Sequence, residues 1–296
     1  MESVKTRKCK VTMDRGAGRV NYDQDSFLVE GLLDENSLAG FYGPSGSRKS
    51  FLIIDIACRV ATGKPWQGLD VKQGSVIYVA AEGSNGMIKR MNAWVNKYNN
   101  GEDIKNFYRI SQPMFVSKQE YIDDLILATE DVLFETGMPV RLIVIDTLAR
   151  CFTGNENAAE DMGAFIAGCD QIKVKSGATI LIVHHTGKDI DRGAKGAYSF
   201  KAALDNEYFV TKDEDKKNLS SRLVCTKSKD GNDELDISIG LKIETLGRTI
   251  KGKVIDTLVV IDGEHDNKNG YVNSNDGSKE EKITKNRPPE VVSDDY

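Results

Sequence analysis

The stretch GPSGSRKS at residues 43–50 has the glycine, lysine and serine spacing of a phosphate-binding loop. In such a loop, successive backbone N–H groups surround an anion at the start of a helix. The pattern G-x-x-x-x-G-K-[ST] is met by Gly43, Lys49 and Ser50, whereas Arg48 occupies the position of the second glycine. We expect Lys49 to neutralise the β- and γ-phosphates and Ser50 to bind Mg²⁺. The alternative is an ordinary glycine–serine turn that contains a lysine by chance.

Arg48 is the departure from the pattern, and its cost depends on where the helix begins. If its backbone needs a positive φ, a residue with a Cβ costs about 1–2 kcal/mol there. If it already belongs to the first helical turn, the side chain points outward and the cost is small.

Further polar side chains stand at the ends of three apolar segments. Asp146 ends RLIVID, where a magnesium ligand belongs, and Glu82 ends VIYVAAE, where a carboxylate can deprotonate the attacking water. His184 and His185 end LIVHH. Each has an ordinary alternative, namely a helix cap, a solvated strand end or a core histidine. Because parallel sheets build their sites at the carboxyl edge, the coincidence of these residues favours a nucleotide site.

Apolar segments alternate with segments of helical periodicity between residues 38 and 187. The predicted strands are residues 38–44, 74–83, 140–147 and 178–187. The predicted helices are residues 49–63, 84–97, 121–135 and 157–177. This alternation predicts an α/β fold with a mostly parallel twisted sheet and helices on both faces. After residue 205, short strands joined by polar turns predict an antiparallel extension of the same sheet.

The chain divides by composition into an N-terminal segment (1–27), a core (28–261) and an acidic tail (262–296). The tail holds nine acidic and five basic residues, hence −4 of the total net charge of −5. The core is therefore nearly neutral, and any DNA contact must come from a local basic loop. We expect the tail to be unstructured. It could mimic DNA, dock a replication partner, or serve only to solubilise the chain.

The composition excludes several classes of protein. With 296 residues, 40% hydrophobic and 29% charged, the chain has ample material for a packed core. It contains no run of eighteen apolar residues that would span a membrane, and no apolar segment near its start that would direct secretion. Its five cysteines are widely spaced, which argues for reduced thiols in a cytoplasmic compartment and against a disulfide framework or a zinc site.

The motifs GPSGSRKSFLIIDIACRVATG, VIYVAAEG, LIVIDTLAR and LIVHHTGKD, in this order, resemble the RepA-like branch of the RecA-fold P-loop ATPases. The resemblance covers about residues 28–261. The branch includes hexameric replicative helicases of plasmids and many phage ATPases. It implies a RecA-like core that assembles into a ring, usually of six subunits, with ATP between subunits and single-stranded DNA in the central channel.

The resemblance also implies roles for individual residues. It makes Glu82 the catalytic base, Asp146 the Walker B acid that binds Mg²⁺ with Ser50, and His185 the sensor of the γ-phosphate. Arg90 resembles a phosphate-proximal arginine of the family. The residues then expected to bind ATP and Mg²⁺ are Gly43, Pro44, Ser45, Gly46, Ser47, Arg48, Lys49, Ser50, Phe51, Arg90 and Asp146.

The trans-acting arginine finger of the family has no obvious counterpart. This chain offers Lys201, Lys227 or Lys229 in the corresponding region. A lysine supplies a point charge without the planar fork of arginine and should stabilise the transition state less well. The alternative is that all three lysines are plain surface residues.

The segment after the histidine strand, residues 186–201, lies where RecA-fold proteins project a loop into the channel. Its cationic and aromatic side chains are Lys188, Arg192, Lys195, Lys201, Tyr198 and Phe200. Basic groups on a glycine-containing loop near aromatic rings suit single-stranded DNA, through phosphate contacts and base stacking. One such loop per subunit would multiply a weak contact in a ring. The alternative is a solvated surface loop.

Three functions remain open on this basis. The first is an ATP-driven, ring-forming motor on single-stranded DNA, a helicase of the plasmid or phage type. The second is a RecA-like recombination ATPase that does not unwind DNA. The third is an accessory protein that hydrolyses nucleotide slowly, which the substitution at Arg48 and the missing finger would fit.

Overall fold

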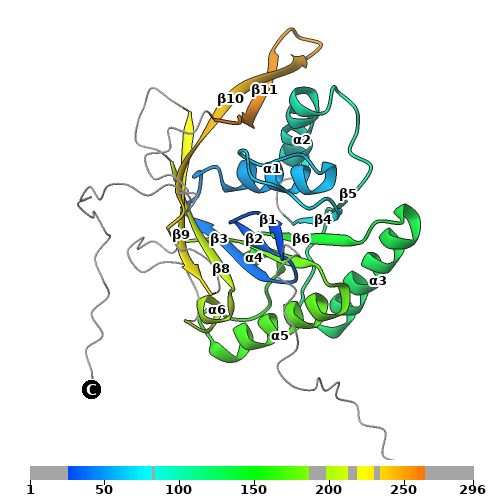
Figure 1. The fold of residues 1–296 in the computed structure, drawn as a ribbon, viewed down its shortest axis with the longest axis vertical. Helices are drawn as coiled ribbons and strands as arrows, with labels where there is room; N and C mark the ends of the chain where they lie inside the picture. The colour runs from blue at the N-terminus through cyan, green and yellow to red at the C-terminus, as the bar shows by residue number, and fades with distance from the viewer. Residues whose placement is uncertain (1–25, 82–83, 187–197, 213–218, 230–233, 264–296) are drawn as a thin grey trace, which may run out of the picture. The chain divides into compact units, whose positions relative to one another are not determined.

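A nine-stranded sheet runs through the described part of the chain, which in this computed structural model comprises residues 26–81, 84–186, 198–212, 219–229 and 234–263 (Figure 1). The strands lie in the order β11-β10-β9-β8-β3-β7-β6-β4-β5. Their bounds are β3 Leu38–Gly43, β4 Ser75–Ala80, β5 Phe107–Ile110, β6 Val140–Asp146, β7 Thr179–His185, β8 Asn206–Lys212, β9 Ser220–Ser228, β10 Asp236–Arg248 and β11 Val254–Val260. A separate pair, β1 (Phe27–Val29) and β2 (Leu33–Asp34), forms a two-stranded sheet.

The predicted fold class is confirmed. Strands β8, β3, β7, β6, β4 and β5 pair in parallel, and β8, β9, β10 and β11 continue the sheet with antiparallel pairing. All four predicted core strands are present. Strands β3 and β4 are buried at every position, as expected for strands covered on both faces.

Helices cover both faces of this sheet (Figure 1). Their bounds are α1 Lys49–Thr62, α2 Ser84–Tyr98, α3 Gln119–Thr136, α4 Leu148–Cys151, α5 Ala159–Ser176 and α6 Tyr198–Ala203. Helices α1 and α2 pack into one apolar core with β9, β10 and β11. Helices α3, α5 and α6 pack into a second core on the opposite face. Helix α1 ends at Thr62, directly before Gly63, the predicted stop, which is left-handed with φ 68° and donates its N–H to the Arg59 carbonyl.

Strand β5 and helix α6 were not predicted. The four residues of β5 are all partly or fully exposed and pair only with β4 at the edge of the sheet, so they lack the continuous apolar signature of the central strands. Helix α6 has only six residues, which is too short for a periodic pattern to be recognised in sequence.

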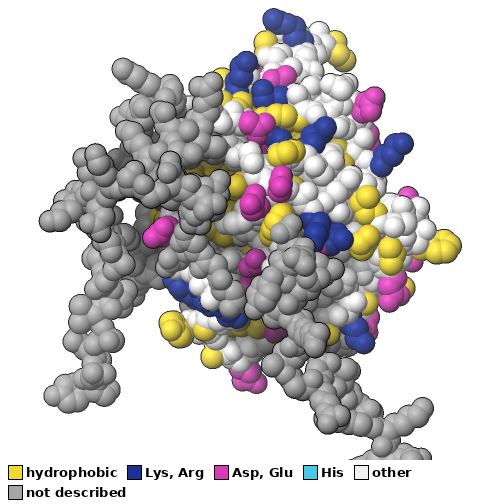
Figure 2. All heavy atoms as spheres, viewed as in Figure 1, with side chains coloured by type: hydrophobic (Ala, Val, Ile, Leu, Met, Phe, Trp, Pro, Cys, Tyr) yellow, Lys and Arg dark blue, Asp and Glu magenta, His cyan; other side chains and the backbone are white. Residues whose placement is uncertain are grey.

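The distal part of β10 and β11 forms a hairpin that projects beyond the sheet (Figure 1). Lysine and arginine side chains lie at its tip (Figure 2), where Arg248, Lys251 and Lys253 are exposed. The proximal part packs against α1 and α2, and Val259 and Val260 are buried there. The antiparallel extension therefore packs against α1, which follows the phosphate loop, and against α2.

The four described cysteines, Cys58, Cys151, Cys169 and Cys225, are buried and free. Burial raises the pKa of the Cys58 thiol well above its usual value. Among the described residues, no helix has both the length and the apolar character that a bilayer crossing needs.

Candidate nucleotide site

The predicted phosphate loop connects β3 to α1 at the carboxyl edge of the sheet. Gly43, the last residue of β3, has φ 157°, and a Cβ built on it would lie 2.1 Å from the Val210 carbonyl oxygen. Only glycine fits this close approach of two backbones. Helix α1 then starts at Lys49, so its first N–H groups lie beside the loop as an anion site requires.

Arg48 adopts the left-handed conformation, with φ 70° and ψ 19°. The second of the two sequence-based possibilities, a place in the first helical turn, is therefore wrong: Arg48 is the residue before the helix, at positive φ. The loop thus has the backbone shape that the missing glycine would allow. It carries the strain of about 1–2 kcal/mol for a residue with a Cβ.

The Lys49 ammonium is folded back over its own loop. Its Nζ donates to the carbonyl oxygens of Gly43 at 2.7 Å and Pro44 at 2.9 Å, and lies 3.4 Å from Nδ1 of His185. Lys49 is 5% exposed. Burial lowers its pKa from 10.5 to about 8, against the opposing charge of Asp146. A phosphate would compete with the two carbonyl oxygens for this ammonium.

Asp146 ends β6 across the cavity from the loop. The Tyr78 hydroxyl donates to Asp146 Oδ2 at 2.7 Å, and Ser50 also hydrogen-bonds this carboxyl group. Burial raises the pKa of Asp146 above its usual value, although the hydrogen bonds from Tyr78 and Ser50 oppose the rise. Carboxylate and hydroxyl oxygens are the ligands that Mg²⁺ prefers, so Ser50 and Asp146 suit the ion expected between them.

His185 and His184 point to opposite sides of β7. His185 contacts Lys49 on the nucleotide side. His184 is buried and lies edge-on to Phe200 of α6, with ring centroids 5.9 Å apart. On one face of β7, His185 therefore contacts the phosphate loop. On the other face, His184 contacts helix α6.

Most of the residues predicted to bind the nucleotide and its Mg²⁺ line one cavity of about 360 Å³. Those lining it are Gly46, Arg48, Lys49, Ser50, Phe51, Arg90, Asp146 and His185. Gly43 and Pro44 contribute the carbonyl oxygens that hold Lys49, while Ser45 is exposed and Ser47 is buried behind the loop. Arg90, on α2, stacks its guanidinium over Phe51, 4.4 Å from the ring centroid.

Tyr78 is a residue of this site that the sequence pattern did not single out. It lies in a strand that is otherwise apolar, so the sequence offers only one indication of its role. That indication is its hydroxyl group, which requires a hydrogen-bond partner when it is buried. Its side chain fixes the Asp146 carboxylate and lines the cavity.

The three lysines considered as fingers are bound within the chain and do not line this cavity. Lys227 Nζ donates to the carbonyl oxygens of Lys201, Ala202 and Leu204, at 2.6–2.8 Å, and so caps the end of α6. Lys229 pairs with Asp205 at 2.8 Å. Lys201 pairs with the buried Glu207 at 3.1 Å.

Several predicted residues lie outside the described part of the chain, namely Glu82, Lys188, Arg192 and Lys195. Of the two aromatic residues expected beside DNA, Tyr198 is 86% exposed, which leaves its ring free to stack on a base. Phe200 is buried against Phe165 and His184 and could not stack without leaving the core.

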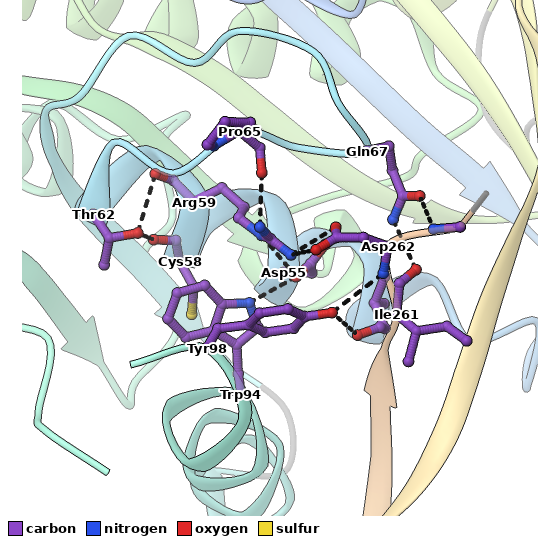
Figure 3. Close-up of polar contacts among 12 residues, drawn as sticks. Asp55, Cys58, Arg59, Thr62, Pro65, Gln67, Trp94, Tyr98, Ile261 and Asp262 are labelled. Carbon is purple, nitrogen blue, oxygen red and sulfur yellow. Dashed lines mark hydrogen bonds and ion pairs between the residues drawn. The ribbon is translucent and has the colours of Figure 1, made fainter. Parts of the chain in front are cut away.

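A polar cluster joins the C-terminal half of α1 to the residues that follow β11 (Figure 3). We call this cluster the C-terminal latch; it consists of Asp55, Arg59, Gln67, Tyr98 and Asp262. Arg59 pairs with Asp55 at 3.4 Å and with both oxygens of Asp262 at 2.8 and 3.0 Å. Gln67 bonds the Ile261 carbonyl and the Gly263 N–H, on either side of Asp262. The Tyr98 hydroxyl donates to the Val260 carbonyl and accepts from the Asp262 N–H. The end of β11 is thus fastened to both α1 and α2.

A sequence model of the AAA domain matches residues 10–191, more than half of the chain. The match includes the phosphate loop, Asp146 and both histidines of β7.

Proposed function

The chain belongs to the AAA domain family of P-loop ATPases, and on that premise we propose that it is a ring-forming ATP-driven motor on single-stranded DNA. The observation that carries the ATP-hydrolysing part of this proposal is the meeting of Lys49, Asp146 and His185 around one cavity at the carboxyl edge of a parallel sheet. A cation, a carboxylate and a histidine in that arrangement suit the binding and cleavage of a magnesium-bound triphosphate.

Each residue has a task in this proposal. Lys49 exchanges its two carbonyl partners for phosphate oxygens, and the N–H groups at the start of α1 surround the β-phosphate. Ser50 and Asp146 would hold Mg²⁺, which would neutralise charge on the phosphates. Glu82, by its resemblance to the catalytic base of RecA-fold ATPases, would deprotonate the attacking water.

The proposed link to DNA is supported by the path of the chain after β7. His185 contacts Lys49, and the chain then continues through the basic segment to α6. A change at the γ-phosphate would reach this segment through the end of a single strand. In a ring, one such segment per subunit would face the DNA strand.

A second candidate is a slow, nucleotide-gated accessory protein. It is favoured by the engagement of Lys201, Lys227 and Lys229 within the chain, since none of them is then available to a neighbouring subunit. Without a trans-acting cation, turnover would be slow.

One experiment separates these candidates. ATP turnover is measured with and without single-stranded DNA, and strand displacement is measured on a forked substrate. The motor proposal expects DNA-stimulated turnover and displacement, both lost in Lys49→Ala and retained in the exposed control Lys175→Ala. Stimulation without displacement would favour a recombination ATPase, and slow turnover that DNA does not stimulate would favour the accessory protein.

A further inference from the structure

Arg48 stands out because its backbone is strained in a loop where glycine would be unstrained. Its φ of 70° and ψ of 19° place it in the left-handed region. Residues with side chains persist in this region when their surroundings hold them there, and they concentrate at functional sites. The contacts that hold Arg48 therefore indicate what the arginine does.

Two hydrogen bonds tie the loop to the start of β9, and we call them the loop strap. Arg48 Nη1 donates to the Ser220 carbonyl oxygen at 2.5 Å, and the Ser221 hydroxyl donates to the Ser47 carbonyl oxygen at 3.2 Å. Ser47 and Ser221 are both buried. The strap thus joins consecutive residues of the loop to consecutive residues of one strand, more than 170 positions later.

The neighbouring strand β8 approaches the same loop. The Val210 carbonyl oxygen lies so close to Gly43 that no Cβ fits between them. Further along, Lys212 Nζ lies 3.9 Å from where a Cβ of Gly46 would be. Strands β8 and β9 therefore meet the loop at both of its ends, β8 at Gly43 and β9 at Ser47 and Arg48.

We propose that Arg48 is a positioning residue of the nucleotide site, which holds the phosphate loop in its anion-binding shape by fastening it to β9. This inference rests on the proposed binding of nucleotide by that loop. A glycine at position 48 would adopt the same φ and ψ without strain, but it would also sample other conformations and would lack the bond to Ser220. The shape of the loop is in this way imposed by β8 and β9.

The decisive variant is Arg48→Gly, which restores the general P-loop pattern. We expect its Kd for ADP and for ATP to rise by about fivefold to tenfold, because one charge-assisted hydrogen bond that orders the loop is lost. Both nucleotides are affected equally, since the loop binds phosphates that they share. Arg48→Lys, which keeps a cation on a long side chain but lacks the guanidinium fork, should lie between Arg48→Gly and the wild type.

Ser221→Ala tests the strap without altering any residue that lines the cavity. It should weaken binding about twofold to threefold, and its effect should be smaller in the Arg48→Gly background because the loop is then already released. Ser111→Ala, at an exposed serine outside the site, is the matched control. Thermal unfolding of every variant shows whether a change in Kd reflects loss of folding.

Each result either supports or overturns the positioning role of Arg48. Unchanged or tighter nucleotide binding by Arg48→Gly overturns the proposal. Weaker binding by Arg48→Gly together with unchanged binding by Ser221→Ala also overturns it, because attachment of the loop to β9 would then not determine affinity. If Arg48→Gly does not fold, the decision falls to Ser221→Ala and Arg48→Lys. A wild-type protein that binds neither nucleotide would instead refute the proposed function.

Discussion

Lys49 Nζ of the phosphate loop lies 3.4 Å from Nδ1 of His185 at the end of β7. The two residues are 136 positions apart in the chain, and the parallel pairing of β3 with β7 brings them together, with Gly43 opposite His185 in the register. The ammonium that we propose binds phosphate and the imidazole that we propose senses it therefore lie in contact across two strands.

The pKa of Lys49 predicts how nucleotide binding depends on pH. Burial lowers this pKa to about 8 in the free protein, and the charge of a bound triphosphate must raise it. Affinity should therefore fall as the pH rises above 8, by up to about tenfold per pH unit, because free Lys49 loses its proton and must regain it on binding. Calorimetry at pH 8.5, in two buffers of different ionisation enthalpy, should detect proton uptake. Lys49→Arg, which stays charged, is the control; equal uptake by both proteins would contradict the prediction.

His185 should act on turnover more than on binding. Its contact with Lys49 lies at the end of the strand, where the γ-phosphate of ATP is expected. We expect His185→Ala to lower kcat by about 10²-fold, as for the loss of one donor to a developing charge, while Kd for ADP changes less than threefold. Single-turnover hydrolysis and ADP titration provide the two numbers. A loss of ADP affinity equal to the loss of kcat would assign His185 to binding.

A substitution of Lys227 distinguishes between two roles for this lysine, a trans-acting cation in ATP hydrolysis and a cap of helix α6. Its ammonium donates to three carbonyl oxygens at the end of α6. If capping is its task, Lys227→Met should lower the free energy of unfolding by about 1–3 kcal/mol, through unsatisfied carbonyl groups, and leave kcat within twofold. Urea unfolding and ATPase assays measure the two effects. A stable variant with a kcat lowered by orders of magnitude would restore Lys227 as the trans-acting cation.

The C-terminal latch should contribute strongly to stability. Arg59 is buried between Asp55 and Asp262, so Arg59→Ala leaves a buried carboxylate without its ion pair. Removing one partner of a buried ion pair costs about 3–5 kcal/mol. Urea unfolding should show this loss, together with a smaller one for Asp262→Ala, whose carboxylate is half exposed. Asp256→Ala, at an exposed position of β11, should be neutral. A neutral Arg59→Ala would show that the latch is not needed for folding.

Asp55 predicts a pH dependence of stability at mildly acidic pH. Burial raises its pKa to about 6, above the usual value near 4, although Arg59 and the indole N–H of Trp94 oppose the rise. The folded state therefore takes up a proton between pH 6 and pH 4 that the unfolded state does not. The contribution of Asp55 to stability rises as the pH falls through 6, by on the order of 1 kcal/mol between pH 7 and pH 5. The free energy of unfolding of Asp55→Asn should not show this rise as the pH falls. Parallel plots of unfolding free energy against pH for the two proteins would contradict the prediction.

Several features of the site were predictable because they depend on local rules. The anion-binding turn follows from Gly43, Lys49 and Ser50, and the place of Asp146 follows from the apolar strand that it ends. Because parallel strands carry their carboxyl ends to one edge, the meeting of Lys49, Asp146 and His185 could be expected once the strands were assigned.

Other features depend on contacts between distant segments, which no local pattern records. The positive φ of Arg48 could not be decided, since the residue is held by the Ser220 carbonyl. Lys227 has the spacing of a finger in sequence, but the packing of α6 makes it a cap.

The sequence by itself thus determined the fold class, the phosphate loop and the chemistry available at the sheet edge, because these follow from apolar periodicity and from short-range spacing. Only the tertiary structure decided that Arg48 is strapped to β9, that Tyr78 orients Asp146, and that Asp262 fastens β11 to the helix of the phosphate loop. Each of these is a contact of a single polar group with a distant partner, and its energy depends on geometry that forms only when the core has packed.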